Sequence, residues 1–221
     1  MFRWLFRWIL LTVLLVGGLA LTRNWIARHL LISELERTTR LPCSVEAMNV
    51  HLSSPVIEAR AVSLYNPPYS SRTPLALEIR AITARYDLGA LLRGRWVFSK
   101  LDVEIAVANV VRSPEGPTNL RGLQQRLDAG GGRNASFVAS EFSIRAEKIC
   151  YVDESRGRPR IQTASHGEVQ TWRDLRGEGA VRKCAAAFLA RLQANDPFEA
   201  PLPPLPKPAS PSSKGKPPRK S

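Results

Sequence analysis

The chain has few of the residues that build metal sites, disulfide frameworks and catalytic centres. Its 221 residues include three cysteines and three histidines. An odd cysteine count permits at most one internal disulfide, and no CxxC or other metal-ligand spacing occurs. The glycines at 130–132 lack the lysine of a phosphate-binding loop. The sequence therefore predicts no enzyme activity, no metal and no cofactor. The residues concerned are Cys43, Cys150, Cys184, His29, His51 and His166.

A continuous basic face is also missing, although the formal charge is +13 from 32 basic and 19 acidic residues. The ends hold most of the excess: residues 1–40 contain 6 basic and 2 acidic residues, and residues 197–221 contain 5 and 1. In the body, acids alternate closely with bases, as at Glu78 and Arg80. Such alternation cannot follow a phosphate backbone, so nucleic acid is not expected as a partner.

The sequence has one long apolar run, from Trp4 to Thr22, which only Arg7 interrupts. Its length matches the roughly 20 residues that cross a hydrocarbon core. Arg3, Trp4, Arg7 and Trp8 are of the types that lie at a membrane interface. We therefore predict a transmembrane anchor over residues 1–22, with the N-terminus in the cytosol and the body outside it.

A cleaved secretory signal is the alternative, because Gly18, Leu19 and Ala20 offer small residues near a cleavage point. Both interpretations export the body. An uncleaved anchor is favoured because a helical apolar pattern continues without a helix breaker until Pro42. We predict a juxtamembrane helix over residues 23–40. The pattern comprises Trp25, Ile26, His29, Leu30 and Leu35.

After Pro42 the pattern changes to the alternation typical of strands, so residues 41–196 are expected to form one β-rich domain. Strands are predicted at residues 56–65, 75–86, 97–110 and 137–152, with weaker patterns at 44–52 and 160–171. The first three are expected to be antiparallel neighbours. Each strand has an apolar face and a polar face, which indicates a sheet covered on one side. The apolar sets are Leu75, Leu77, Ile79 and Ala81 in one strand, and Leu101, Val103, Ile105 and Val107 in the next.

The connectors predict short helices. At residues 87–94, Asp87 can cap a helical turn in which Leu88, Leu91 and Leu92 share a face, and Gly94 can end it. A second helix follows Gly116 and carries Leu120, Leu123 and Leu127 on one side. A third, from about Ala180 to Leu192, has an apolar stripe that comprises Val181, Cys184, Phe188, Leu189 and Leu192.

Residues 197–221 contain 9 of the 17 prolines and predict an extended, disordered tail.

The order of these motifs resembles that of the AsmA-like proteins of double-membrane bacteria. The resemblance covers roughly residues 1–127: a span running into a helix, a strand ending in Asn66-Pro67, the D-L-x-x-L-L-x-G connector from Asp87, and a strand leading to Gly116-x-x-Asn119-Leu120. It implies an anchor in the inner membrane, a curved sheet in the periplasm and kinship with repeating β-groove lipid-transfer proteins. This chain is far shorter, and Pro68 stands where glycine is common.

Two functions from different classes follow. In the first, the apolar face of the sheet is a groove for acyl chains, lined by Leu75, Leu77, Ile79, Leu101, Val103 and Ile105; an ordinary covered core is the alternative. Seven or eight strands about 4.8 Å apart would extend such a groove only about 35 to 40 Å, too short to cross an envelope alone. In the second, the anchored domain is a structural or assembly factor. Its partners would be other envelope proteins, bound through an exposed strand edge or the proline-rich tail.

Overall fold

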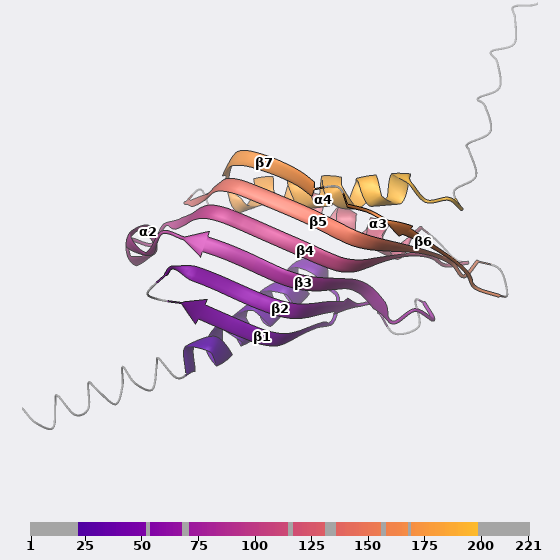
Figure 1. Cartoon of the computed structure of the whole chain (residues 1–221), viewed down its shortest axis with the longest axis horizontal. Coiled ribbons are helices and arrows are strands. Elements are labelled where there is room, and N and C mark those ends of the chain that lie inside the picture. Colours follow the sequence, from indigo (N-terminus) through magenta and orange to yellow (C-terminus); the bar gives the residue numbers. More distant parts are fainter. Residues whose placement is uncertain are drawn as a thin grey trace, which may run out of the picture.

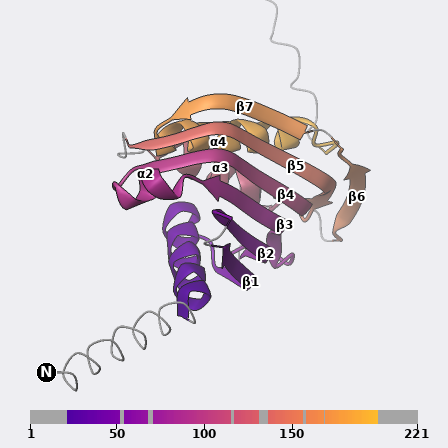
Figure 2. The same ribbon diagram turned by 60° about the vertical axis from the view of Figure 1, so that its left-hand side comes forward.

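The protein is described here from a computed structural model, which covers residues 22–51, 54–67, 71–114, 117–130, 136–155, 158–167 and 169–198. Within these residues a curved seven-stranded sheet carries helices on one face (Figures 1 and 2). The fold class predicted for the body, α+β with a mainly antiparallel sheet, is confirmed. A helix over residues 22–39 comes first. Then follow β1 (Cys43–His51), β2 (Val56–Tyr65), β3 (Leu75–Tyr86), α2 (Leu88–Leu92), β4 (Trp96–Arg112), α3 (Asn119–Ala129), β5 (Phe137–Asp153), β6 (Arg160–Ser165), β7 (Val169–Arg176) and α4 (Glu178–Ala194).

The strongly alternating strands lie where the sequence predicted them. The bounds of β2 and β3 coincide with the predicted ones, and those of β4 and β5 extend one or two residues further. From β1 to β4 each strand pairs with the next in antiparallel fashion. The expected antiparallel arrangement of β2, β3 and β4 is therefore correct.

The pair β4 and β5 is parallel, which the sequence analysis did not predict. Parallel neighbours need a crossover connection, usually a helix, because the chain must return to the same end of the sheet. The crossover here contains α3, and its apolar side covers the sheet on the way back.

The predicted strand at 160–171 is two strands. β6 pairs with the second half of β5, and β7 pairs with the first half of the same edge. β6 ends at Ser165, and the amide of the next residue, His166, still donates to the carbonyl of Glu147 at 2.9 Å. The two strands together form one edge of the sheet.

The hydrophobic core lies between the sheet and the helices on its concave face (Figure 2). Every leucine predicted on the apolar side of α3 and every member of the α4 stripe belongs to this core. Phe188 and Leu192 of α4 and Leu120 of α3 are almost fully buried. These helices therefore close the face that the strand alternation left apolar.

Helix 22–39, the predicted juxtamembrane helix, packs against the same core. Its buried side chains are Leu31, Ile32 and Leu35. The apolar pattern predicted from Trp25 onward is divided between two surroundings: Leu35 packs on the core, whereas Trp25, Ile26 and Leu30 are exposed. The helix covers part of the apolar face of the sheet, and this contact determines which side of the helix is buried.

None of the helices in the described part of the chain is long and apolar enough to cross a membrane. The predicted anchor lies outside the described residues except for Thr22, and so do its interface residues Arg3, Trp4, Arg7 and Trp8. The predicted tail is outside them as well, apart from Pro197 and Phe198.

Candidate interaction surfaces

The six residues predicted to line a groove lie in or beside the closed core. Leu77, Ile79 and Ile105 are only 4 to 6 % exposed. Leu101 and Val103 pack against the same core, and Leu75 is half-buried near the end of β3. Leucines of α3 and aromatic and aliphatic side chains of α4 meet this face. The prediction that these residues line an accessible groove is therefore corrected: helices occupy the place where an acyl chain would lie.

Ala81 and Val107 were predicted to lie on the apolar face, and this prediction is wrong because the register shifts before each of them. The pairing of β3 with β4 is irregular around Ile79, where Arg80 has no partner residue. Beyond this bulge the inward residues of β3 change parity, and Ala84 and Tyr86 are buried in place of odd-numbered residues. Val107 pairs with Glu78, whose side chain is exposed, so it faces away from the core.

The motif asparagines that carry the AsmA-like resemblance meet in space. The Asn119 amide nitrogen donates to the side-chain oxygen of Asn66 at 2.9 Å and to the carbonyl of Asn109 at 3.0 Å. Its side-chain oxygen accepts from the amides of Val111 at 2.8 Å and Leu120 at 2.9 Å. Asn119 thus uses its full hydrogen-bonding capacity. It joins the end of β2, strand β4 and the start of α3.

Asn109, which the sequence analysis missed, completes this asparagine cluster (Asn66, Asn109 and Asn119). Its side-chain nitrogen donates to the carbonyl of Leu75 at 2.9 Å, and the nitrogen of Asn66 donates to that of Thr73 at 2.8 Å. Both side chains are buried. The sequence contained one signal for it: Asn109 is a polar residue within an apolar strand segment, directly before Val110 and Val111. The cluster joins β2, β4 and the start of α3 through buried hydrogen bonds.

The D-L-x-x-L-L-x-G connector forms the predicted helical turn. Asp87 caps α2 by accepting from the amide of Ala90 at 2.9 Å, and Gly94 ends the turn with φ of 73°. Leu88 and Leu91 pack in a small cluster with Tyr86 and Phe98. Leu92, predicted to share their face, is 81 % exposed. Gly116 lies outside the described residues, and Pro67 follows β2 as predicted.

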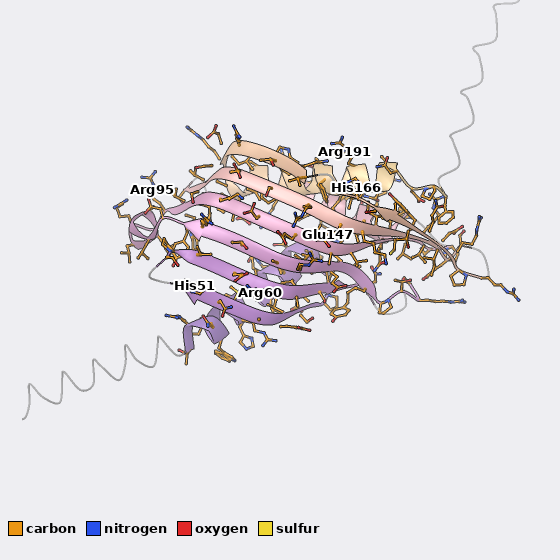
Figure 3. The ribbon with its side chains drawn as sticks, viewed as in Figure 1. His51, Arg60, Arg95, Glu147, His166 and Arg191 are labelled. Atoms are coloured by element: carbon orange, nitrogen blue, oxygen red, sulfur yellow. The ribbon has the colours of Figure 1, made fainter. Side chains whose placement is uncertain are left out.

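The face of the sheet opposite the helices is polar and carries balanced ion pairs. Arg80 of β3 pairs with Glu147 of β5, and Arg145 pairs with Glu104 at 2.9 Å. Figure 3 shows Glu147 in the middle of this face. Lys100 pairs with Asp102 at 2.9 Å, and this hydrogen bond raises the pKa of the lysine. Exposed pairs of this kind add little stability but keep the face hydrated. It is neither an apolar nor a uniformly basic surface.

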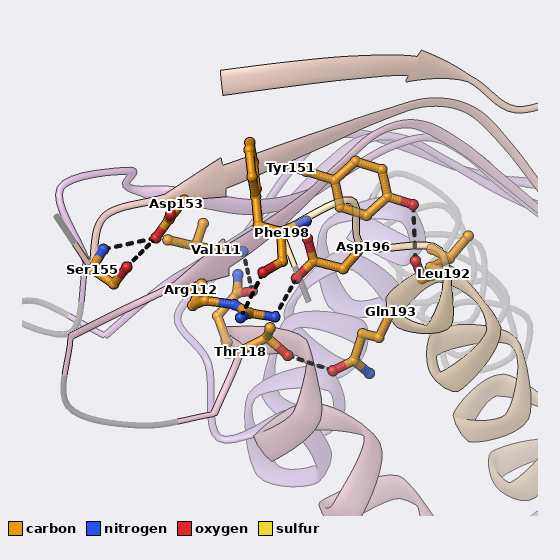
Figure 4. A network of polar contacts seen from close by, with 11 residues as sticks. Val111, Arg112, Thr118, Tyr151, Asp153, Ser155, Leu192, Gln193, Asp196 and Phe198 are labelled. Atoms are coloured by element: carbon orange, nitrogen blue, oxygen red, sulfur yellow. Dashed lines mark hydrogen bonds and ion pairs between the residues drawn. The ribbon is translucent and has the colours of Figure 1, made fainter. Parts of the chain in front are cut away.

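A polar cleft of about 500 Å³ lies where α3 and α4 meet the end of β4. Figure 4 shows the contacts along it. The guanidinium of Arg112 donates to the carboxylate of Asp196 and to the carbonyl of Phe198, at 2.9 and 3.0 Å. Thr118 hydrogen-bonds to Gln193, and Arg160 stacks on the ring of Phe198. These contacts hold the end of α4 against the sheet, so the cleft's buried charges are already neutralised.

The β6–β7 edge has no further strand beside it in the described part of the chain. His166 and Glu147 form a hydrogen-bonded pair, and regular antiparallel pairing alternates. The amides of residues 160, 162 and 164 therefore face β5, and those of residues 161, 163 and 165 face outward. On β7, Asp174 has φ of 56°, and the pairing with β5 is interrupted there without a shift of register. β6 pairs with β5 continuously from Arg160 to Ser165, so it is the more regular edge strand of the two.

The opposite edge, β1, is capped by helix 22–39. Asn24 accepts from the amide of Val50 at 3.0 Å, and Glu36 accepts from the amide of Cys43 at 3.1 Å. These two contacts attach the helix to both ends of β1. The two edges of the sheet therefore differ: in the described residues, helix 22–39 contacts both ends of β1, whereas no helix or further strand lies along the outer side of β6.

All three cysteines are free thiols. Burial raises the pKa of the Cys43 thiol from 9.0 to about 11, and the carboxylate of Glu36 adds to the shift. Burial also raises the pKa of Cys184. Across the described ranges, no group of three or more His, Cys, Asp or Glu side chains is placed to hold a metal ion.

In a variant with Cys150→Ala and Cys184→Ala, the rate of Cys43 alkylation is expected to keep rising with pH up to about 11. The same chain unfolded in urea serves as the control, and its rate should level off near pH 9. Because the folded chain holds this proton more tightly, its contribution to stability is complete below pH 9 and is lost as the pH rises through about 11. A folded-state rate that levels off near pH 9 would show that the thiol is hydrated.

No protein-family model, no curated protein and no solved structure matches this chain. The AsmA-like resemblance therefore stays a prediction. What the geometry adds is that two of its motifs, Asn66-Pro67 and the Asn119-Leu120 pair, are joined by a direct hydrogen bond between residues 53 apart in the sequence.

Proposed function

We propose that this chain is a membrane-anchored, non-enzymatic envelope protein whose body works as a structural or assembly domain. The observation that supports this most is the contrast between a closed core and an open strand edge. The apolar face of the sheet is filled by helices, whereas β6 leaves the amides of residues 161, 163 and 165 without strand partners in the described structure. A partner could add a strand there through backbone hydrogen bonds.

A lipid cargo in the sheet is the less favoured function, since the six candidate lining residues are packed in or against the core. The proposal keeps the predicted location, with the N-terminus in the cytosol and the body in the periplasm. It also keeps other envelope proteins as partners. The tail is a second candidate contact for such a partner. Phe198, the last described residue, lies beside β6, where its ring contacts the guanidinium of Arg160.

The test uses the full chain in its membrane, with a photo-crosslinking amino acid at position 161, which is 69 % exposed on β6. We expect a discrete adduct that Thr163→Pro abolishes, because proline removes one outward amide without removing a bond to β5. Thr163→Ala is the matched control: it loses the same hydroxyl, which lies 3.7 Å from Cys150, but it keeps the amide. The adduct should survive in this variant.

Two further arms separate the alternatives. The crosslinker at Leu92, which is exposed on α2 at the far end of the sheet, should give no such adduct. Deletion of residues 199–221 leaves Asp196 and Phe198 in place and should preserve the adduct. Loss of the adduct on that deletion would assign the contact to the tail, and an adduct that persists in Thr163→Pro would exclude strand addition.

A further inference from the structure

Helix 22–39 has two different exposed halves along one side. Trp25, Ile26 and Leu30 are 63, 39 and 65 % exposed, and no other stretch of six described residues exposes three large apolar side chains. The ring of Trp25 meets that of His29 edge-on, with centroids 4.4 Å apart. Further along, the exposed residues are Ser33, Glu34, Glu36 and Arg37. The exposed side of one helix therefore changes within two turns from a stretch dominated by large apolar side chains, with Arg28 and His29 among them, to a polar and charged one.

Leu30 and Arg37 make this change explicit. Seven residues of an α-helix return to the same face within about 20°. The Arg37 side chain is 73 % exposed, similar to Leu30, and it pairs with Glu34. The two positions differ mainly in their distance along the helix, about 10 Å at 1.5 Å per residue. A protein partner lying along the helix would not require a change of polarity at this point, whereas a boundary between apolar and aqueous surroundings would.

The helix is fixed to the body, so its exposed residues cannot turn independently. Asn24 holds the amide of Val50, and Arg126 of α3 donates to the carbonyl of Thr39 at the other end. On the opposite side, Leu31, Ile32 and Leu35 are committed to the core. Whatever contacts Trp25 and Leu30 therefore also fixes the orientation of the sheet.

We propose that Trp25, Ile26 and Leu30 insert into the headgroup layer of the bilayer that holds the predicted anchor. This inference rests on the membrane anchor of the proposed function. Tryptophan and long aliphatic side chains favour this layer, and Arg28, exposed on the same stretch, can pair with lipid phosphates. The predicted anchor ends at Thr22, and Leu30 lies about 12 Å further along the helix axis. A headgroup layer is only about 5 to 8 Å deep on each side, so an upright helix would place Leu30 outside it. The helix must therefore tilt well away from the membrane normal, which brings the body close to the bilayer surface.

The test compares single nitroxide labels at positions 30 and 37 in the full chain, with the three native cysteines replaced by alanine, in vesicles of phosphatidylethanolamine and phosphatidylglycerol. A label in the headgroup layer is reached better by oxygen, and a label in water is reached better by a water-soluble nickel chelate. We expect an oxygen-to-nickel accessibility ratio several-fold higher at position 30 than at position 37. A third label at Leu92 should match position 37.

Each other outcome has a definite reading. Equal ratios at positions 30 and 37, in chains that remain in the membrane after alkaline extraction, would overturn the inference and leave the anchor intact. A label at position 30 that neither reagent reaches would mean that protein covers it, either a second copy or residues 199–221, and would also overturn it. Chains released by alkaline extraction would instead contradict the anchor, and with it the proposed function.

Discussion

Replacement of Phe188 by alanine is expected to lower the free energy of unfolding by about 4 kcal/mol. Phe188 is 1 % exposed and belongs to the core between α4 and the sheet. Truncation removes the transfer free energy of the ring and leaves a cavity that the packed helices can fill only in part. Urea unfolding of the full chain in mild detergent, followed by tryptophan fluorescence, measures the change. Leu92→Ala, at an exposed leucine, should cost only a few tenths of a kcal/mol.

The same variant distinguishes a closed core from a lipid groove. In a groove filled by exchangeable acyl chains, a smaller side chain would leave room for lipid and cost little stability. The wild-type protein should also fail to bind a fluorescent long-chain fatty acid in a saturable way. A cost below about 1 kcal/mol, together with saturable binding, would restore the groove hypothesis.

The strands were predictable because their alternation is strong and local. β2 and β3 lie between proline-rich or polar connectors and alternate over most of their length, with a break at Arg80 in β3, and their bounds coincide with the prediction. The helices were predictable for the same reason, from leucines at helical spacing and from the cap at Asp87. These features depend on residues close together in the chain, so they can be predicted from a single sequence.

The placement of the elements was not predictable in the same way. Whether an apolar strand face becomes a groove or a core depends on which helices return to it, and that is a property of distant segments. The parallel pairing of β4 with β5 and the bulge at Arg80 depend on tertiary context as well. A bulge moves every later side chain to the other face. Ala81 follows the bulge at Arg80 of β3, and Val107 follows the unpaired Ala106 of β4, which is why both were misassigned.

The exposed apolar residues of helix 22–39 illustrate a related limit. A helical pattern shows which residues share a face, but two apolar stripes on one helix cannot be ranked by sequence alone. Leu31, Ile32 and Leu35 pack on the core. Asn24 and Glu36 hydrogen-bond to β1 and so fix the rotation of the helix about its axis that turns these three side chains inward. The candidate functional surfaces, this stripe and the β6 edge, are thus what remains after the core has formed.

The asparagine cluster gives the second large expected effect. Asn119→Asp is expected to lower the free energy of unfolding by about 3 kcal/mol, although the two side chains have nearly the same shape. The substitution replaces an NH2 group by an oxygen, and that oxygen then faces the acceptors of Asn66 and Asn109 at about hydrogen-bond distance. Asn66 could turn its own NH2 group towards the carboxylate only by giving up its bond to the carbonyl of Thr73.

The pH dependence of this variant separates lost hydrogen bonds from a general packing defect. The introduced carboxyl faces acceptors, so its pKa should rise above that of an ordinary aspartate when the chain is folded. The folded variant then binds a proton more tightly than the unfolded one, and its deficit relative to wild type should shrink as the pH falls through that raised pKa. Urea unfolding at several pH values between 4 and 8, roughly the range of carboxyl titration, measures this. Gln125→Glu, the same chemical change on the exposed side of α3, should cost under about 0.5 kcal/mol at every pH. A deficit in Asn119→Asp that stays constant with pH would mean that the two donated hydrogen bonds do not hold β2, β4 and α3 together.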